Sequence, residues 1–503
     1  MRKKLFTWIE RNEGLILLIL LSIVLRIPSL YEPYWYGDEG IYLVLGQAWK
    51  KGLVFYRDIH DNKPPLLYIL AGIAGNVFYF RLMLMAWFGV GVGLFYRLIQ
   101  ILFPKNRKAW NLSTLLMIWL TTITEGNIAN AEIFIVMPVV AGMLLVYQGL
   151  KEKSKQWQKW AGAGLLFSAG FLLKVPALFD LLAAGVWLVV FEKKTVKEFI
   201  KGLWDKKPWL LGVGFLGPIG LSMAYYYKMG AGERYFRSVL GQNIGYLASW
   251  GTGEHEAGGL AGQSGLVTRA MVLLIGLVVF YVISKRYKLV SGIKLIVVWF
   301  MMAMFGALLS ERPYPHYLIQ PVVPLAILVS YFFYGQRKVV KGVVLGVLVV
   351  AMAYYWQIRF WHYPIVPYYK NFIDYSLGKK SLEDYRVYFD GRANQTYKLA
   401  EYLKAKTLPE DRVFIWGNEP YVYALADRLP IGRYTVTYHI VDFNGFDETI
   451  EAFDKYKPKV VMVMEYEEKK FEELMSRLMT DYVMVEKIDK ALVYRRVNGI
   501  GYK

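Results

Sequence analysis

The chain has 503 residues, 56% of them hydrophobic, and a mean hydropathy of +0.30. Its many long apolar runs are typical of a protein that crosses the membrane several times, because one span needs roughly 20 mostly apolar residues. Cysteine is absent, which excludes disulfides and thiolate metal sites. The net charge of +20 does not favour nucleic-acid binding, because residues 380–503 carry 20 basic and 21 acidic side chains and the excess lies in the apolar part.

The N-terminus predicts an uncleaved signal-anchor. Arg2, Lys3 and Lys4 precede an apolar run from Leu15 to Leu25, and no small-residue cleavage site follows. Short basic loops mark the cytoplasmic face of membrane proteins. We assign the N-terminus to that face together with five basic loops, at residues 105–108, 151–159, 193–207, 285–288 and 337–341.

About 11 spans (11–13) are predicted for this polytopic α-helical membrane protein. They cover residues 14–30, 82–103, 109–124, 132–150, 160–173, 176–191, 208–229, 266–284, 292–309, 317–334 and 339–356. An odd count with a cytoplasmic N-terminus places the C-terminal tail outside. If the apolar stretch 66–80 crossed the membrane, every later basic loop would face outward. We therefore predict that this stretch is a juxtamembrane helix on the outer face, interfacial or re-entrant. The alternative is that this stretch spans and that 82–103 is a half-helix.

The predicted domains are a transmembrane module at residues 1–356, a linker at 357–379 and a soluble extracytoplasmic α/β domain at 380–503. The tail alternates strand-like with helix-like segments, a pattern typical of a small layered domain. We predict strands at 412–417 and 459–465, a hairpin over 482–496, and helices at 393–407, 419–427, 447–456 and 467–478. The predicted outer loops are 31–65, 125–131, 230–265 and 310–316.

The first outer loop, residues 31–65, carries the most informative motif. Asp38 and Glu39 lie just past the first span, and Lys63 precedes Pro64-Pro65. Charged groups at a bilayer boundary are costly and tend to mark chemistry or transport. Asp38 is suited to accept a proton and Lys63, on a rigid proline-flanked segment, to contact a phosphate. The alternatives are a helix-start acid for Asp38 and an interfacial lysine for Lys63.

The segment from Pro33 to Tyr42, Pro-Tyr-Trp-Tyr-Gly-Asp-Glu-Gly-Ile-Tyr, resembles the first outer loop of C-type glycosyltransferases (GT-C). Within them it is similar to the branch of the protein O-mannosyltransferases and the lipid A aminoarabinose transferase. The resemblance implies a GT-C fold over about residues 10–360. It implies that Asp38 is the catalytic carboxylate and that Lys63, in Asn-Lys-Pro-Pro-Leu, contacts the donor phosphate.

Two later segments also match places in that branch. The segment 127–132, Asn-Ile-Ala-Asn-Ala-Glu, takes the place of its second acidic motif, and 312–317, Arg-Pro-Tyr-Pro-His-Tyr, resembles the late loop that frames the donor pocket. Here Glu132 stands alone instead of in a paired Asp-x-Asp. Dependence on a divalent metal is therefore not expected, and no cofactor is assigned.

The remaining candidate side chains are weighed against structural alternatives. Glu39 is a second catalytic candidate, and Lys174 and Arg312 are further phosphate contacts, although Lys174 could instead pair with Asp180. The substrate-binding candidates are Glu132, His60, Asp61, Tyr314, His316 and Tyr317. Tyr314 and Tyr317 are also typical interfacial anchors. Arg234, Arg237, Asn243 and Tyr246 could line an acceptor cleft.

The prediction is a multi-pass enzyme of the cell (inner or plasma) membrane. It transfers a sugar from a polyprenyl-phosphate carrier to an extracytoplasmic lipid, glycan or protein acceptor, with inversion at the sugar. The alternative is a lipid or glycolipid transporter (flippase), which predicts ionisable residues deep within the spans and inverted repeats.

Overall fold

The computed structural model describes residues 2–151, 155–193, 198, 206–241, 265–309 and 312–497, with side chains from residue 12 onward. These residues form two compact units. The first comprises the described residues of 1–27, 82–225 and 239–364, and the second comprises those of 28–81, 226–238 and 365–503. The first outer loop therefore groups with the C-terminal residues, and the predicted linker at 357–379 contains a helix, α17 (Ile365–Ser376).

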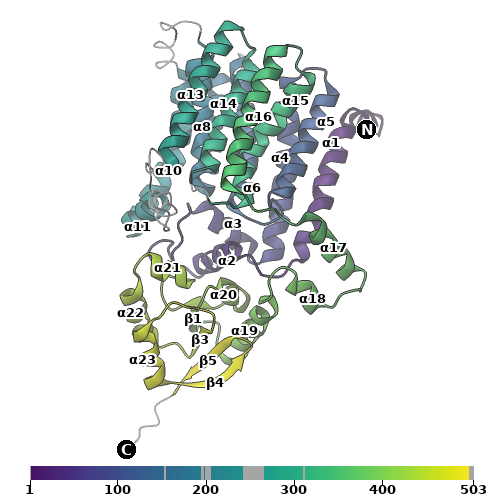
Figure 1. Ribbon diagram of the computed structural model, residues 1–503. Coiled ribbons are helices and arrows are strands. Elements are labelled where there is room, and N and C mark those ends of the chain that lie inside the picture. The colour runs from purple at the N-terminus through teal and green to yellow at the C-terminus, as the bar shows by residue number, and fades with distance from the viewer. Residues whose placement is uncertain are drawn as a thin grey trace, which may run out of the picture. The chain divides into compact units, whose positions relative to one another are not determined.

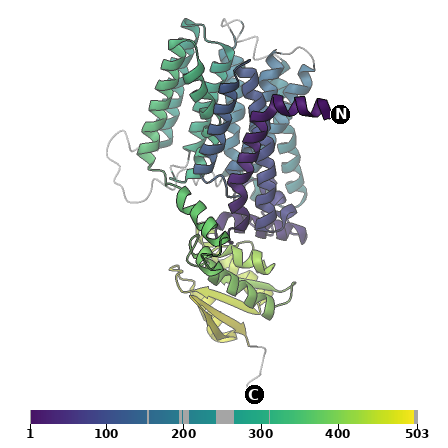
Figure 2. The same cartoon turned by 90° about the vertical axis from the view of Figure 1, so that its right-hand side faces the viewer.

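The first unit is a bundle of long helices that lie side by side (Figures 1 and 2). Its helices, including two that extend a few residues into the second unit, are α1 (Arg2–Arg26), α4 (Val77–Leu102), α5 (Arg107–Ile123), α6 (Ala131–Lys151), α7 (Gln156–Leu173), η2 (Val175–Ala177), α8 (Leu178–Val186), η3 (Trp187–Phe191), α10 (Lys206–Lys228), α13 (Gly265–Arg286), α14 (Ser291–Ala307), η7 (Pro315–Leu318), α15 (Ile319–Tyr334) and α16 (Lys338–Ile358).

Each of the eleven predicted spans coincides with a described helix. Seven helices in the described part of the chain are long and apolar enough to cross a membrane: 12–31, 77–102, 131–151, 206–228, 265–286, 315–334 and 338–358. The other four, which are α5, α7, 175–191 and α14, are shorter or less apolar. A multi-span membrane protein is therefore confirmed, whereas the count of eleven stays a prediction.

The second unit begins with η1 (Ile27–Tyr31), α2 (Gly37–Lys50) and α3 (Leu66–Ala74). With 9 residues, α3 extends only about 14 Å, too short to cross a core of about 30 Å, and it ends at Gly75. The predicted juxtamembrane helix is therefore shorter than expected, because residues 77–80 continue into α4. Helices α2 and α3 cross at two glycines: a Cβ added to Gly46 would collide with the Gly72 backbone.

The C-terminal part of this unit is a small α/β layer. Its elements are α18 (Leu382–Val387), α19 (Ala393–Lys406), β1 (Arg412–Trp416), α20 (Pro420–Ala426), β2 (Leu429–Pro430), α21 (Thr437–Asp442), α22 (Phe446–Tyr456), β3 (Val460–Met464), α23 (Glu472–Asp481), β4 (Tyr482–Ile488) and β5 (Ala491–Arg496). The unit also contains α11 (Gly232–Phe236) and the first two residues of η4 (Arg237–Gly241). The sheet order is β2-β1-β3-β5-β4, parallel from β2 to β3 and antiparallel beyond.

Aromatic side chains form the core on one sheet face. Phe414 and Trp416, alternate residues of β1, pack with Phe453 of α22 and with Leu474 and Leu478 of α23. Alternation along a strand sends such residues to one face, which the two helices cover. The predicted α/β tail is confirmed, with the last predicted helix beginning at Glu472 instead of residue 467.

Candidate active site

The first group of candidate residues belongs to the second unit and starts in the first turn of α2. Asp38 lies in this turn, and its side chain is 35% exposed. The N-cap residue is Tyr36, whose side chain makes no capping hydrogen bond. The hydroxyl of Tyr42, one turn on, donates to Asp38 Oδ2 at 3.0 Å. The carboxylate is thus fixed at the positive end of a helix and remains reachable by a substrate.

Lys63 meets Asp38. Its Nζ lies 3.5 Å from Asp38 Oδ2 and 4.9 Å from the centre of the Tyr42 ring. The Lys63 backbone is held from both sides, since its carbonyl accepts from the Tyr56 hydroxyl at 2.8 Å and its N–H donates to the Tyr68 hydroxyl at 2.9 Å. The structure therefore brings together the residues predicted as base and as phosphate contact.

Asp61 provides a second carboxylate on Lys63. It is 2% exposed, and its Oδ2 lies 3.8 Å from Lys63 Nζ and accepts from the Tyr68 hydroxyl at 2.9 Å. Its Oδ1 accepts the Asn62 N–H at 2.8 Å. Burial, together with the charge of Asp61, raises the pKa of Tyr68 well above its ordinary value, so this hydroxyl remains a donor. Buried charges need such partners, and Asp61 is placed to orient Lys63.

Glu39 is buried in an ion-pair network. It is fully buried, and Arg81 donates to it from Nε at 2.8 Å. Arg81 also pairs with Glu32 at 3.0 Å and donates to the Ser29 carbonyl at 2.8 Å. This position favours a structural role for Glu39 over the catalytic role that the sequence suggested.

His60 is also enclosed by protein. It is 2% exposed, its backbone N–H donates to the Arg433 carbonyl at 2.9 Å, and its ring packs edge-on against Tyr434, His439 and Phe443. Burial lowers the pKa of His60 well below its ordinary value. A neutral ring among aromatic side chains is better suited to packing than to the substrate contact predicted for it.

The second group of candidate residues lies in the first unit, at the start of α6. Glu132 is 3% exposed and forms an ion pair with Lys174, which follows α7. The Lys174 Nζ also lies 4.4 Å from the centre of the Tyr317 ring. The expectation that Lys174 could pair with Asp180 is wrong, because Asp180 is bound by Trp299 Nε1 at 2.6 Å and Gln320 Nε2 at 2.7 Å.

His316 connects two glutamates in this group. Its Nδ1 lies 2.7 Å from Glu125 Oε2, and its Nε2 lies 3.7 Å from Glu132 Oε1. The Tyr314 ring is nearly parallel to the imidazole, with centroids 5.4 Å apart. The structure thus gathers five side chains in one group of the first unit: Glu125, Glu132, Lys174, His316 and Tyr317.

The other predicted residues have weaker structural support. Arg312 is half-buried in the loop that precedes His316. Arg237 pairs with Glu233 on the surface, and Arg234 donates to the Arg57 carbonyl at 3.1 Å. Asn243 and Tyr246 lie outside the described residues. Among the residues that are described, no cluster of three or more His, Asp or Glu side chains has an arrangement that could hold a metal ion.

The sequence did not identify three residues that contact the first group of candidates: Arg81, Arg433 and His439. Arg81 carried a usable signal, because an arginine at the edge of an apolar helix requires a buried counter-charge. Arg433 and His439 carried none, because nothing in the order of the tail residues indicates which of them approach the first outer loop.

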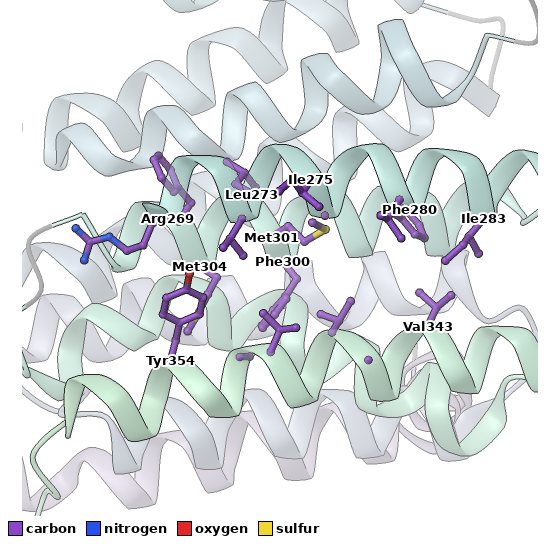
Figure 3. Close-up of a pocket in the computed structure, with 18 of the residues that line it drawn as sticks. Arg269, Leu273, Ile275, Phe280, Ile283, Phe300, Met301, Met304, Val343 and Tyr354 are labelled. Atoms are coloured by element: carbon purple, nitrogen blue, oxygen red, sulfur yellow. The ribbon is translucent and has the colours of Figure 1, made fainter. Parts of the chain in front are cut away.

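The first unit also contains an apolar groove between α13, α14 and α16 (Figure 3). Its volume is about 680 Å³, and its walls include Leu273, Phe300 and Val343. Arg269 and Tyr354 lie near one end, whereas Ile283 lies toward the other (Figure 3).

Comparison with known proteins is consistent with this architecture. Residues 62–225 match the family model of dolichyl-phosphate-mannose-protein mannosyltransferases. The structure of ArnT from Cupriavidus metallidurans bound to undecaprenyl phosphate matches with a TM-score of 0.57 and 13% identity, covering 97% of this chain and 99% of that chain. The apo state of ArnT matches with a TM-score of 0.55 and 12% identity, covering 97% and 98%.

An oligosaccharyltransferase from Archaeoglobus fulgidus matches with a TM-score of 0.46 and 12% identity, covering 91% of this chain and 70% of that chain. No curated protein matches the sequence. The predicted resemblance to C-type glycosyltransferases is confirmed by the family match and the ArnT match, and the chain has the GT-C fold.

Proposed function

We propose that the chain is an integral membrane glycosyltransferase that moves a sugar from a polyprenyl-phosphate carrier to an acceptor hydroxyl on the outer side of the membrane. The GT-C fold and the match of residues 62–225 to a mannosyltransferase family support the reaction class. The undecaprenyl phosphate bound by ArnT supports the type of carrier. The observation that carries the proposal is the 3.5 Å approach of Lys63 Nζ to Asp38 Oδ2.

The proposed reaction uses these two side chains in different roles. Asp38 removes the proton from the acceptor hydroxyl while its oxygen attacks the anomeric carbon. The bond from that carbon to the phosphate oxygen breaks, and polyprenyl phosphate leaves with the electron pair. Lys63 stabilises the charge that develops on the phosphate. Because attack comes from the side opposite the phosphate, the configuration at the anomeric carbon inverts.

The second group supplies supporting roles in this proposal. Glu132, held by Lys174 and His316, orients the donor or the acceptor. Arg312, in the loop before His316, provides a further phosphate contact. Arg312 would act as Lys63 does, because a departing phosphate is stabilised by a fixed positive charge beside it.

The groove of the first unit suits the lipid part of such a donor. An isoprenoid chain is long and apolar, and the walls between α13, α14 and α16 are formed almost entirely by apolar side chains. We assign the chain of the carrier to this groove, because a ligand gains most from apolar contact where polar groups are few.

The proposed orientation follows the basic loops. We propose that the protein lies in the inner or plasma membrane with a cytoplasmic N-terminus. The first outer loop and the C-terminal domain then lie on the outer side of that membrane. Lipid-linked sugars are the donors that can serve an enzyme on that side, because their lipid tails remain in the bilayer.

The transporter alternative predicted ionisable side chains deep within the spans, whereas Asp180 lies in the first turn of α8. Its two oxygens are bound by Trp299 and Gln320, which favours a structural role. Incubating the purified protein with labelled polyprenyl-phosphate sugars and a lipid, a glycan and a protein acceptor separates the two functions. The enzyme releases polyprenyl phosphate and labels an acceptor, whereas a transporter leaves the sugar–phosphate bond intact.

A further inference from the structure

A histidine of the C-terminal domain lies beside the loop that carries Lys63. His439, on α21, is 4% exposed, and its Nε2 lies 3.8 Å from Asp61 Oδ1. The other oxygen of Asp61 faces Lys63 at 3.8 Å, and Lys63 faces Asp38 at 3.5 Å. Four side chains from α2, the loop and α21 thus form one continuous line of charged and polar groups.

This contact is supported by several backbone anchors within the same unit. The Arg433 carbonyl accepts the backbone N–H of His60 at 2.9 Å, and Arg433 Nη1 donates to the Tyr56 carbonyl at 3.3 Å. The Tyr421 hydroxyl donates to the Tyr36 carbonyl, just before α2. Because both α2 and the loop are held by residues of the C-terminal domain, the position of His439 relative to Asp61 is fixed on both sides.

The charges in this line are unbalanced, and the His439 imidazole is placed to offset this as a hydrogen-bond donor. One ammonium, Lys63, lies between two carboxylates, Asp38 and Asp61. When Lys63 turns to a phosphate, Asp61 loses part of its compensation while it stays buried, and an uncompensated buried charge is costly. The imidazole of His439 is the neighbour that can form a hydrogen bond to Asp61 after a small movement, because 3.8 Å is just beyond hydrogen-bonding distance.

We propose that His439 is a positioning residue for the donor phosphate: it holds Asp61 so that Lys63 can turn from Asp61 to the phosphate. In this proposal the C-terminal domain contributes a residue to the donor site. This inference rests on the proposed function, since it presumes that Lys63 binds a phosphate.

The test measures the dissociation constant of undecaprenyl phosphate for the full-length protein in detergent. His439→Ala is expected to weaken binding roughly three- to tenfold, as is usual for coupled neighbours. His439→Gln, which retains a hydrogen-bond donor at a similar place, is expected to restore most of the loss. In a Lys63→Ala background, His439→Ala is expected to cause no further loss, because its effect passes through Lys63.

Two further variants make the result unambiguous. Asp61→Asn keeps the shape of the side chain and should abolish the effect of His439→Ala in the same way. His362→Gln, a change at an exposed histidine, is the matched control and should bind like the wild type. An equal loss from His439→Ala with and without Lys63 would overturn the inference, since it would indicate only a structural role.

Failure of the inference differs from failure of the proposed function. If the wild type transfers sugar but the losses at His439 and Lys63 simply multiply, only the role of His439 is refuted. If the wild type neither transfers sugar nor binds undecaprenyl phosphate, both are refuted.

Discussion

Arg81 and Glu39 form an ion pair in which both side chains are fully buried, with Arg81 Nε 2.8 Å from Glu39 Oε1. Glu39→Gln removes one of the two buried carboxylates that pair with Arg81, and Glu32 remains as its partner. Removing the only partner of a buried charge costs about 3–5 kcal/mol, so we expect a loss toward the lower end of this range. We expect a clear fall in the unfolding temperature in detergent, whereas the protein that remains folded should keep its turnover number. A variant of normal stability that has lost turnover would instead place Glu39 in contact with the substrate.

Glu132 and Lys174 should behave as a coupled pair in the first unit. Because Glu132 is 3% exposed, Lys174→Met leaves a buried carboxylate without this cation, and we expect it to destabilise the protein by about 3–5 kcal/mol. The double variant Glu132→Gln, Lys174→Met should recover part of that loss. Unfolding temperatures of the four proteins in one double-mutant cycle provide the test; additive losses would contradict direct coupling.

The pH dependence of stability should include a contribution from His60. Burial lowers its pKa in the folded protein well below the ordinary value of about 6.5. Between the two pKa values the unfolded chain binds more protons than the folded chain, so stability is lost as the pH falls from about 6.5. The slope from one histidine is at most about 1.4 kcal/mol per pH unit.

His60→Phe should flatten this part of the curve without loss of stability at pH 8. Neither ring nitrogen of His60 has a hydrogen-bond partner within the described structure, and the ring packs against aromatic side chains. Unfolding temperatures measured from pH 5 to 8 test this expectation, with His362→Phe as the exposed control. An unchanged slope in His60→Phe would show that His60 is not the titrating group.

The groove in the first unit can be blocked without disturbing the core. Gly346 lines the groove on α16, and no atom lies within 4 Å of a Cβ added there. We expect Gly346→Phe to raise the KM for a polyprenyl-phosphate donor roughly tenfold or more, because the ring takes the place of the isoprenoid chain. Gly220→Phe on α10, where a Cβ also meets open space, is the matched control. Equal KM values in both variants would exclude this groove as the site of the chain.

The long apolar runs of the sequence predicted the positions of the membrane helices well. Hydropathy located helices such as α6 and α13 closely, because a spanning helix must satisfy its backbone internally and remain apolar over its length. The number of true spans did not follow in the same way, since helices such as α5, with 17 residues, extend only about 26 Å, less than an apolar core of about 30 Å.

The meeting of Asp38 with Lys63 was predictable in part, because both lie in one loop between apolar segments. The burial of Glu39 was not, since its partner Arg81 lies in the next helix and the sequence gives no register between them. The approach of His439 to Asp61 depends on how the C-terminal layer folds back onto the loop. Contacts of this kind between distant segments follow from tertiary packing and not from local pattern.

The most direct test of the account is the turnover of Asp38→Asn, measured as release of polyprenyl phosphate from a labelled donor. Asp447→Asn is the matched control, because Asp447 also lies in the first turn of a helix and is exposed. The account predicts a loss of at least about a hundredfold in Asp38→Asn, within the range for removing a general base, with normal folding and near wild-type turnover in Asp447→Asn. Unchanged turnover in a correctly folded Asp38→Asn protein would contradict the assignment of Asp38 as the base.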